Sequence, residues 1–255
     1  MSQSGRANAK AGRRIGAAGG VYGVRTMRAR GPGEAALVTY ARTMEDPRIA
    51  SLRRALAGRP AESARREPGT LEAGVTLVLR AGAELELLLI ERVERAGDPW
   101  SGHMALPGGM RERSDGDLLA TALRETREEV GVTLDRELHL LGALDEVHPG
   151  SRRLPSLVIA PFVAAVGPHV SAVPDPAEVA TALWVPLSRL RGEDAVSEVL
   201  VELDDGARRF PSFLYRDDAR DYQIWGLTYR ILTGFLELAD VAVAEGLTVE
   251  PAGRG

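Results

Sequence analysis

The sequence predicts an α+β sandwich, in which several strands are combined with a small number of helices. Short apolar runs typical of strands are mixed with two long amphipathic segments, an order that differs from a regular alternation of strands and helices. The 255 residues, of which 44% are hydrophobic, suffice for one sizeable domain with extra segments or for two small domains.

The N-terminal part of the chain is expected to lie outside the main domain. Residues 1–33 contain seven Lys or Arg and no acid. We interpret 1–44 as a disordered tail, and an organelle-import segment or an overextended start is the alternative. Residues 45–70 are expected to form a short helix and a linker, because a proline follows Asp46 at the first turn and Gly58 ends the apolar pattern.

The main domain is expected over residues 71–242, with a flexible tail over 243–255. A loop rich in glycine and proline at 96–109 precedes a helix at 117–130, which Gly131 ends as a C-cap. The other expected elements are strands at 75–79, 85–90, 138–145, 157–166 and 182–186 and a last helix at 222–240.

The composition excludes several classes of function. The chain has no cysteine, which excludes disulfides, thiolate nucleophiles and cysteine-ligated zinc. A net charge of -4, without an extended basic face beyond the N-terminus, disfavours a nucleic acid polymer as partner. No run of about 18 apolar residues predicts a transmembrane helix, so no membrane partner is expected. We predict a cytoplasmic location, and organelle import through the basic N-terminus stays open.

Three glutamates in the middle of the chain carry the expected chemistry. Glu125, Glu128 and Glu129 are related by i+3 and i+4, so they share one face of the predicted helix. Carboxylates crowded on one face repel one another unless a cation lies among them, and hard ions such as Mg²⁺ or Mn²⁺ prefer carboxylate oxygens. Such a site would support attack of water on phosphorus. A solvated acidic face paired with neighbouring arginines is the alternative.

The segment from Gly108 to Val132 resembles the signature of the Nudix family, a glycine followed by Arg-Glu, Glu-Glu and a second glycine. Three details differ from the general signature. The interval from Gly109 to Arg124 is one residue longer, Asp115 stands near the place of the first glutamate, and Thr126 replaces a bulky apolar residue. The resemblance implies a Nudix-type α/β/α sandwich with a mixed sheet and a catalytic loop-helix-loop.

Further segments resemble the coenzyme A diphosphatase-like branch of that family. They are Leu88-Leu89-x-x-Arg92, the stretch 102–109 that ends in Leu-Pro-Gly-Gly, and 222–228, Tyr-Gln-Ile-Trp-Gly-Leu-Thr. Asp98 departs from the branch, because its signature has there an arginine that would bind anionic phosphate.

The resemblance implies a metal-dependent hydrolase of a diphosphate linkage in a small nucleoside diphosphate derivative. Coenzyme A or acyl-coenzyme A is the first expectation. ADP-ribose, dinucleoside polyphosphates and oxidised nucleoside triphosphates are alternatives, and a non-catalytic Nudix module that senses a nucleotide is an alternative of another class. A homodimer is left open.

The same resemblance implies roles for single residues. Arg124 would orient a glutamate, Glu125 and Glu129 would bind Mg²⁺ or Mn²⁺, and Glu128 would be a third ligand or the base. Gly109 would contribute a backbone ligand. The residues expected to contact substrate are Arg92, Arg95, Glu178 as a late carboxylate, and His148, with an exposed loop residue as the alternative for the last two.

Overall fold

The computed structural model describes residues 34–97, 100–149, 156–203, 206–218 and 220–247. The helices are α1 (Glu34–Glu45), α2 (Pro47–Ala57), α3 (Leu118–Val130), α4 (Leu187–Arg191) and α5 (Gly226–Leu247), with a 3₁₀ turn η1 (Glu193–Ala195). The strands are β1 (Leu71–Ala81), β2 (Leu85–Arg92), β3 (Met104–Ala105), β4 (Gly108–Met110), β5 (Leu140–Ala143), β6 (Leu157–Val166), β7 (Val179–Pro186), β8 (Val196–Leu203), β9 (Gly206–Arg216) and β10 (Asp221–Trp225).

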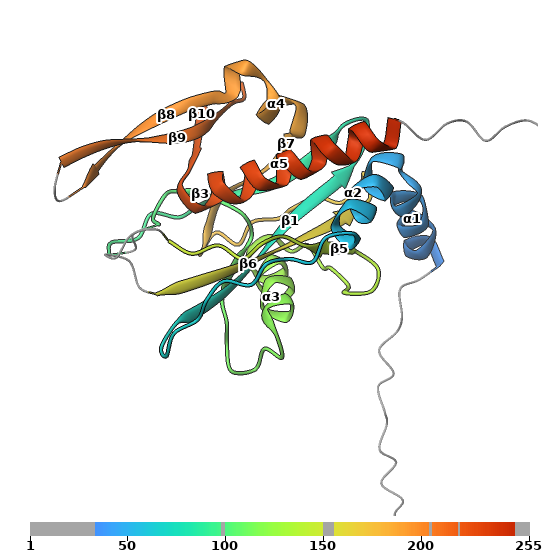
Figure 1. The fold of residues 1–255 in the computed structure, drawn as a ribbon, viewed down its shortest axis with the longest axis horizontal. Coiled ribbons are helices and arrows are strands. Elements are labelled where there is room, and N and C mark those ends of the chain that lie inside the picture. Colours follow the sequence, from blue (N-terminus) through green and yellow to red (C-terminus); the bar gives the residue numbers. More distant parts are fainter. Residues whose placement is uncertain (1–33, 98–99, 150–155, 204–205, 219, 248–255) are drawn as a thin grey trace, which may run out of the picture.

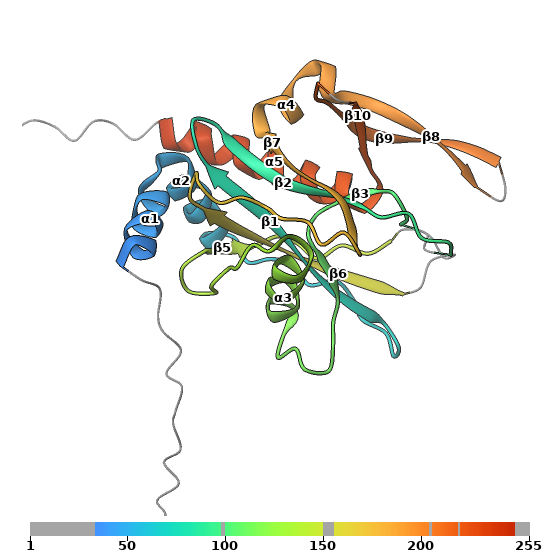
Figure 2. The same cartoon turned by 180° about the vertical axis from the view of Figure 1, so that it is seen from behind.

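A seven-stranded mixed sheet forms the centre of the molecule, as predicted. Its main order is β3-β2-β1-β6-β5, while β7 pairs with β2 and β4 pairs with β1. The long central strands β1 and β6 are parallel, and the other pairings in this sheet are antiparallel. Helix α3 covers one face, and α2 and α5 cover the other (Figures 1 and 2).

The core consists of two clusters because alternate residues of the central strands point to opposite faces of the sheet. Leu87 and Leu89 belong to the cluster under α2 and α5, whereas Leu88 and Ile90 belong to the cluster under α3. All four side chains are buried. The near-continuous apolar run of β2 follows from this burial on both faces.

Several elements agree with the sequence predictions. The linker helix is α2, with Asp46 as its N-cap, and the strand expected at 157–166 is β6. The helix expected at 117–130 is α3, since Asp117 caps it and accepts a hydrogen bond from the amide of Ala120 at 2.8 Å.

Other predictions were wrong. The last helix begins only at Gly226, because residues 221–225 form β10, which pairs with β9 over its whole length. Alternating side chains at 222 and 224 enter the core as strand residues, a pattern that also fits a helical spacing. Helix α5 continues to Leu247, into the expected C-terminal tail. The two strands β8 and β9 were not predicted at all.

The predicted tail over 1–44 also needs correction, because residues from Glu34 onward form α1. Thr43 and Met44 are buried, and the ring of Tyr40 lies edge-on to that of His139, with centroids 6.3 Å apart. Residues 1–33 and Asp98 lie outside the described residues. Within the described part, no helix is both long enough and apolar enough to cross a membrane.

We expect Met44→Ala to lower the free energy of unfolding by about 2 kcal/mol, because Met44 is 8% exposed and contributes to the core under α5. Denaturant unfolding measures the change as a lower midpoint at an unchanged slope. Val38→Ala on the same helix is the control, since Val38 is 49% exposed. Equal stability of the two variants would show that α1 is not docked in solution.

Candidate active site

Glycines bring the loop before α3 into close contact with β1. Gly109 pairs with Gly74 in the register of β4 and β1. A Cβ atom on Gly74 would lie 2.2 Å from the carbonyl oxygen of Leu118, and one on Gly108 would lie 2.4 Å from the carbonyl oxygen of Gly74. Side chains at these positions would separate the strand, the loop and the helix. Only glycine permits this approach, which sets the place of α3 on the sheet.

Arg124 is held by Asp115 in the loop that precedes the helix. Its Nε and Nη2 atoms donate to the two carboxylate oxygens of Asp115 at 3.1 and 3.0 Å. The guanidinium keeps the pKa of the Asp115 carboxyl far below its usual range, although burial opposes this shift. The amide of Glu112 and the hydroxyl of Thr121 also donate to Asp115. The aspartate that replaces the first glutamate of the signature is therefore a buried anchor for Arg124.

From this anchor, Arg124 reaches two of the three helix glutamates. Its Nη1 atom lies 2.9 Å from Glu125 Oε1 and 2.9 Å from Glu128 Oε2. Its Nη2 atom also donates to the carbonyl of Met110 at 3.2 Å. One cation thus joins the loop, the strand end and the acidic face of α3. These contacts are the ones that an orienting role of Arg124 requires.

Three carboxylates meet beside the glycine turn. One oxygen from each of Glu125, Glu129 and Glu178 lies within 4.8 Å of the other two. Glu129 is 2% exposed, and its Oε2 accepts a hydrogen bond from the amide of Gly108 at 2.8 Å. A Cβ on Gly109 would lie 2.5 Å from Cδ of Glu125, so this glycine leaves room for the carboxylates.

The charges in this cluster are poorly balanced. The pKa of Glu129 is raised to about 8, mainly by burial and also by the nearby charges of Glu125 and Glu178, while the Gly108 amide and Arg92 act in the opposite direction. Burial also raises the pKa of Glu125, against the effect of Arg124. Carboxylates with raised pKa values are typical of functional sites, and a bound cation would relieve the repulsion among them.

The loop that carries Glu178 is attached to the end of α3. The carbonyls of Glu129 and Val130 accept hydrogen bonds from the amides of Asp175 and Val173 at 2.8 and 2.9 Å. These are carbonyls that a helix end leaves without intrahelical partners. The amide of Val93 donates to the carbonyl of Glu178 at 3.0 Å. Glu178 therefore comes from a loop remote in sequence yet fixed to the same helix.

The structure brings some of the predicted residues together and leaves others apart. Glu178, expected to contact substrate, lies in the carboxylate cluster, whereas Glu128 lies outside it with its side chain 47% exposed against Arg124. The guanidinium of Arg95 donates to the carbonyl of Ala177, beside Glu178. His148 is exposed, and its carbonyl accepts a hydrogen bond from Arg230 at 2.7 Å.

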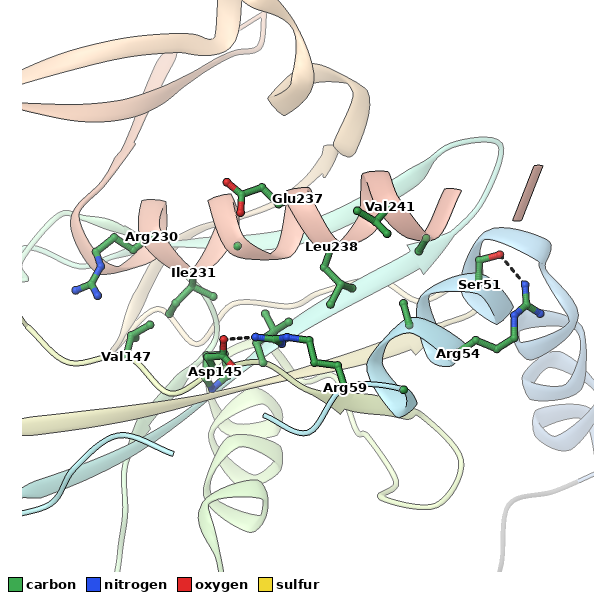
Figure 3. A pocket seen from close by; sticks show the side chains of 16 residues that line it. Ser51, Arg54, Arg59, Asp145, Val147, Arg230, Ile231, Glu237, Leu238 and Val241 are labelled. Atoms are coloured by element: carbon green, nitrogen blue, oxygen red, sulfur yellow. Dashed lines mark hydrogen bonds and ion pairs between the residues drawn. The ribbon is translucent and has the colours of Figure 1, made fainter. Parts of the chain in front are cut away.

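A cavity of about 920 Å³ lies elsewhere, between α2, α5 and the loop after β5 (Figure 3). Leu238 and Val241 contribute to its apolar wall, and Arg54, Asp145 and Glu237 are among its polar residues. It is on the face of the sheet opposite α3, and none of the predicted site residues lines it. The chemistry indicated by the carboxylates is therefore not located in this cavity.

We expect Asp115→Asn to reduce stability by about 3 kcal/mol, because it leaves a buried Arg124 charge without its main partner. Thermal and denaturant unfolding measure this effect. Asp117→Asn is the control, since asparagine is an equally good N-cap and the ion pair of Asp117 with Arg136 is about half exposed and contributes little. A similar small loss in both variants would contradict the anchoring role of Asp115.

Comparison with known proteins confirms the resemblance seen in the sequence. The NUDIX domain family profile matches residues 70–203. The chain is 37% identical over 132 residues to an uncharacterized protein of Schizosaccharomyces pombe, covering 50% of this chain and 40% of that protein. It is 30% identical over 145 residues to the uncharacterized Nudix hydrolase NudL of Photorhabdus laumondii, covering 57% and 73%.

It is also 31% identical over 164 residues to the human mitochondrial coenzyme A diphosphatase NUDT8, covering 60% of this chain and 62% of that protein. The chain thus spans less than two thirds of the length of the yeast and human relatives. The profile match covers just over half of the chain and includes the glycine turn, α3 and the loop of Glu178. This chain belongs to the Nudix hydrolase family.

Proposed function

We propose that this protein hydrolyses a diphosphate linkage in a nucleoside diphosphate derivative with the help of a divalent cation. The cluster of Glu125, Glu129 and Glu178 beside the glycine turn carries this proposal. It supplies several hard oxygen ligands at one place, next to an amide-lined turn of the kind that approaches phosphates closely. A non-catalytic nucleotide-sensing module would have no need to keep these three carboxylates together.

The residues present fit Mg²⁺ or Mn²⁺. Glu125, Glu129 and Glu178 would hold the ion, together with the carbonyl of Gly109, whose lack of a Cβ leaves the necessary space. All these donors are oxygen atoms, the preference of both ions. When bound, the ion would neutralise charge that develops on the phosphoryl oxygens.

The protein's own groups would perform the remaining tasks. Glu128 is our proposed base or further ligand, because it lies one turn from Glu125 and is accessible. Arg124 would hold it in place until substrate and cation bind. Arg92, whose charge already acts on Glu129, and Arg95, beside the loop of Glu178, would contact the phosphates. His148 stays a prediction, with no contact that places it at the cluster.

Coenzyme A or an acyl derivative is the substrate we propose first. The human relative and a peroxisomal relative from Caenorhabditis elegans, 32% identical over 137 residues, are named coenzyme A diphosphatases. ADP-ribose is our second choice. Asp98 stands where the branch has an arginine, and its negative charge would repel a strongly anionic substrate more than a less anionic one. Measurement of kcat/KM with Mg²⁺ and with Mn²⁺ would decide between these substrates. The compounds to compare are coenzyme A, dephospho-coenzyme A and ADP-ribose.

We expect Glu129→Gln to reduce kcat at least about a hundredfold while the protein stays folded, because it removes a buried ligand charge. Glu178→Gln should have an effect in the same direction. The measurement is turnover of the best substrate at saturating Mg²⁺, with circular dichroism as a check of folding. Glu237→Gln is the matched control, since Glu237 lies at the cavity on the opposite face. Near-normal turnover of Glu129→Gln, or strong loss in Glu237→Gln, would refute the proposed site.

We also expect cation affinity to rise with pH. With a pKa of about 8, Glu129 is protonated in the cation-free protein at neutral pH, and the ion must displace that proton. The dissociation constant for Mn²⁺ should therefore fall by up to about tenfold per pH unit from pH 6 to 8. In the unfolded state the Glu129 carboxyl has its ordinary pKa of 4.5, so the folded protein binds one more proton than the unfolded one between pH 4.5 and 8. The free energy of unfolding of the cation-free protein should therefore decrease as the pH rises from 6 to 8.

Calorimetric titration with Mn²⁺ at pH 6, 7 and 8 measures this dependence, and Glu129→Gln should remove it. An affinity that is constant over this range in the wild type would show that Glu129 is not a ligand.

A further inference from the structure

The second sheet of the molecule has no role in the chemistry described so far. Strands β8, β9 and β10 form a three-stranded antiparallel sheet, which we call the wing, and it extends away from the main sheet in Figure 1. Its β10 end lies against β3, and the guanidinium of Arg220 pairs with the carboxylate of Glu91 at the end of β2. The wing is therefore fixed to the edge of the main sheet.

One face of the wing packs into the core, and the opposite face carries two half-buried aromatic rings. Phe213 and Ile224 belong to the core under α5. Trp225 and Phe210 occupy alternate positions in their strands, so they point to the opposite face. Their ring centroids are 5.7 Å apart, and the ring of His103 lies edge-on to Trp225 at 4.7 Å. All three residues are half-buried.

These rings lie on the same side of the sheet as the carboxylate cluster. Ile90 packs beneath α3. The pairing of β2 with β7 shifts register between Glu91 and Arg92, but Arg92 acts on the charge of Glu129 and is therefore assigned to the face of α3 as well. The amide of Arg92 donates to the carbonyl of His103 at 3.1 Å, one step beyond the paired residues Glu91 and Met104. His103 is thus opposite Arg92 and shares its face of the sheet.

The strand spacing gives the separation between Glu178 and His103, the ring carried by the main sheet. The amide of Val93, the residue after β2, donates to the carbonyl of Glu178, and the amide of Arg92 at the end of β2 donates to the carbonyl of His103. Two strand spacings amount to about 10 Å between the backbones of Glu178 and His103. A nucleoside diphosphate spans a comparable length, because its ribose separates the base from the phosphates.

We propose that Trp225 and Phe210, supported by His103, form the platform on which the nucleobase of the substrate stacks. This inference rests on the proposed function and adds the class of group that the wing binds. Aromatic rings hold a base by its π-face whatever its identity, and a half-buried indole fixed by neighbouring rings needs little ordering to do so. With its diphosphate at the carboxylates, a nucleotide would lie across the ends of β7, β2 and β3.

The first test is binding without catalysis, in the absence of divalent cation. AMP carries the base and ribose 5-phosphate lacks it, so the wild type should bind AMP at least about tenfold more tightly, measured by calorimetry. Phe210→Leu and Trp225→Leu should each weaken AMP binding about tenfold and leave ribose 5-phosphate binding unchanged. Trp225→Phe, which keeps a ring, should restore most of the affinity.

The second test is steady-state hydrolysis of ADP-ribose. Loss of a ring should raise KM about tenfold with little change in kcat, because the base is bound alike in the ground state and the transition state. Tyr215→Leu is the matched control. Tyr215 is also in the wing but is stacked on Tyr222 on the buried side, with centroids 6.2 Å apart.

The outcomes separate this proposal from the proposed function. If the protein hydrolyses ADP-ribose but the AMP affinity and the KM are the same in both ring variants as in the wild type, the platform is refuted and the proposed active site is not. If no diphosphate is hydrolysed but the ring variants bind AMP more weakly, the platform is supported and the proposed function is refuted. A loss of kcat alone in the ring variants would also refute the platform.

Discussion

The contact of α3 with β1 positions the glycine turn and the helix glutamates of the candidate active site. At Gly74 the helix approaches the strand so closely that a single methyl group would collide with the carbonyl of Leu118. This approach places the buried end of Glu129 under the amide of Gly108 and the carboxylate of Glu125 over the Cα of Gly109. The site thus depends on the absence of side chains as much as on the presence of carboxylates.

The electrostatics of the site follow from this packing. Arg124 is neutralised by Asp115 from the loop, and it carries enough remaining donors to hold Glu125 and Glu128. Glu129 has only an amide and the more distant Arg92 to offset its burial, so its pKa rises while that of Asp115 falls. On this face of α3, Arg124 balances the negative charges near Asp115, whereas the carboxylate of Glu129 has no comparable partner. A divalent cation would supply the missing positive charge.

The sequence predicted the parts of this arrangement that depend on local spacing. The caps and apolar period of α3, and the i+3 and i+4 relation of its glutamates, are properties of a single helix. The partner Glu178 was expected at the substrate instead of in the cluster, because its place depends on hydrogen bonds from the 173–175 loop to the end of α3. The wing was missed for a similar reason, since β8 and β9 are defined by their pairing with each other, and apolar residues of β8 such as Val196 and Leu200 stay exposed instead of entering the core.

The replacement of an apolar residue by Thr126 shows how a tertiary contact can accommodate a departure from the family signature. Thr126 is fully buried, and its hydroxyl donates to the carbonyl of Ala122 at 2.7 Å and lies 3.1 Å from the hydroxyl of Thr76 on β1. A hydroxyl buried alone would be unfavourable, but here β1 supplies a second hydroxyl at the same depth. The pair fixes α3 on the strand by hydrogen bonds, where the usual residue would do so by apolar packing, and it lies one turn from both Glu129 and Ala122. Helix and strand are thereby joined by polar contacts within the very interface that sets the geometry of the carboxylates.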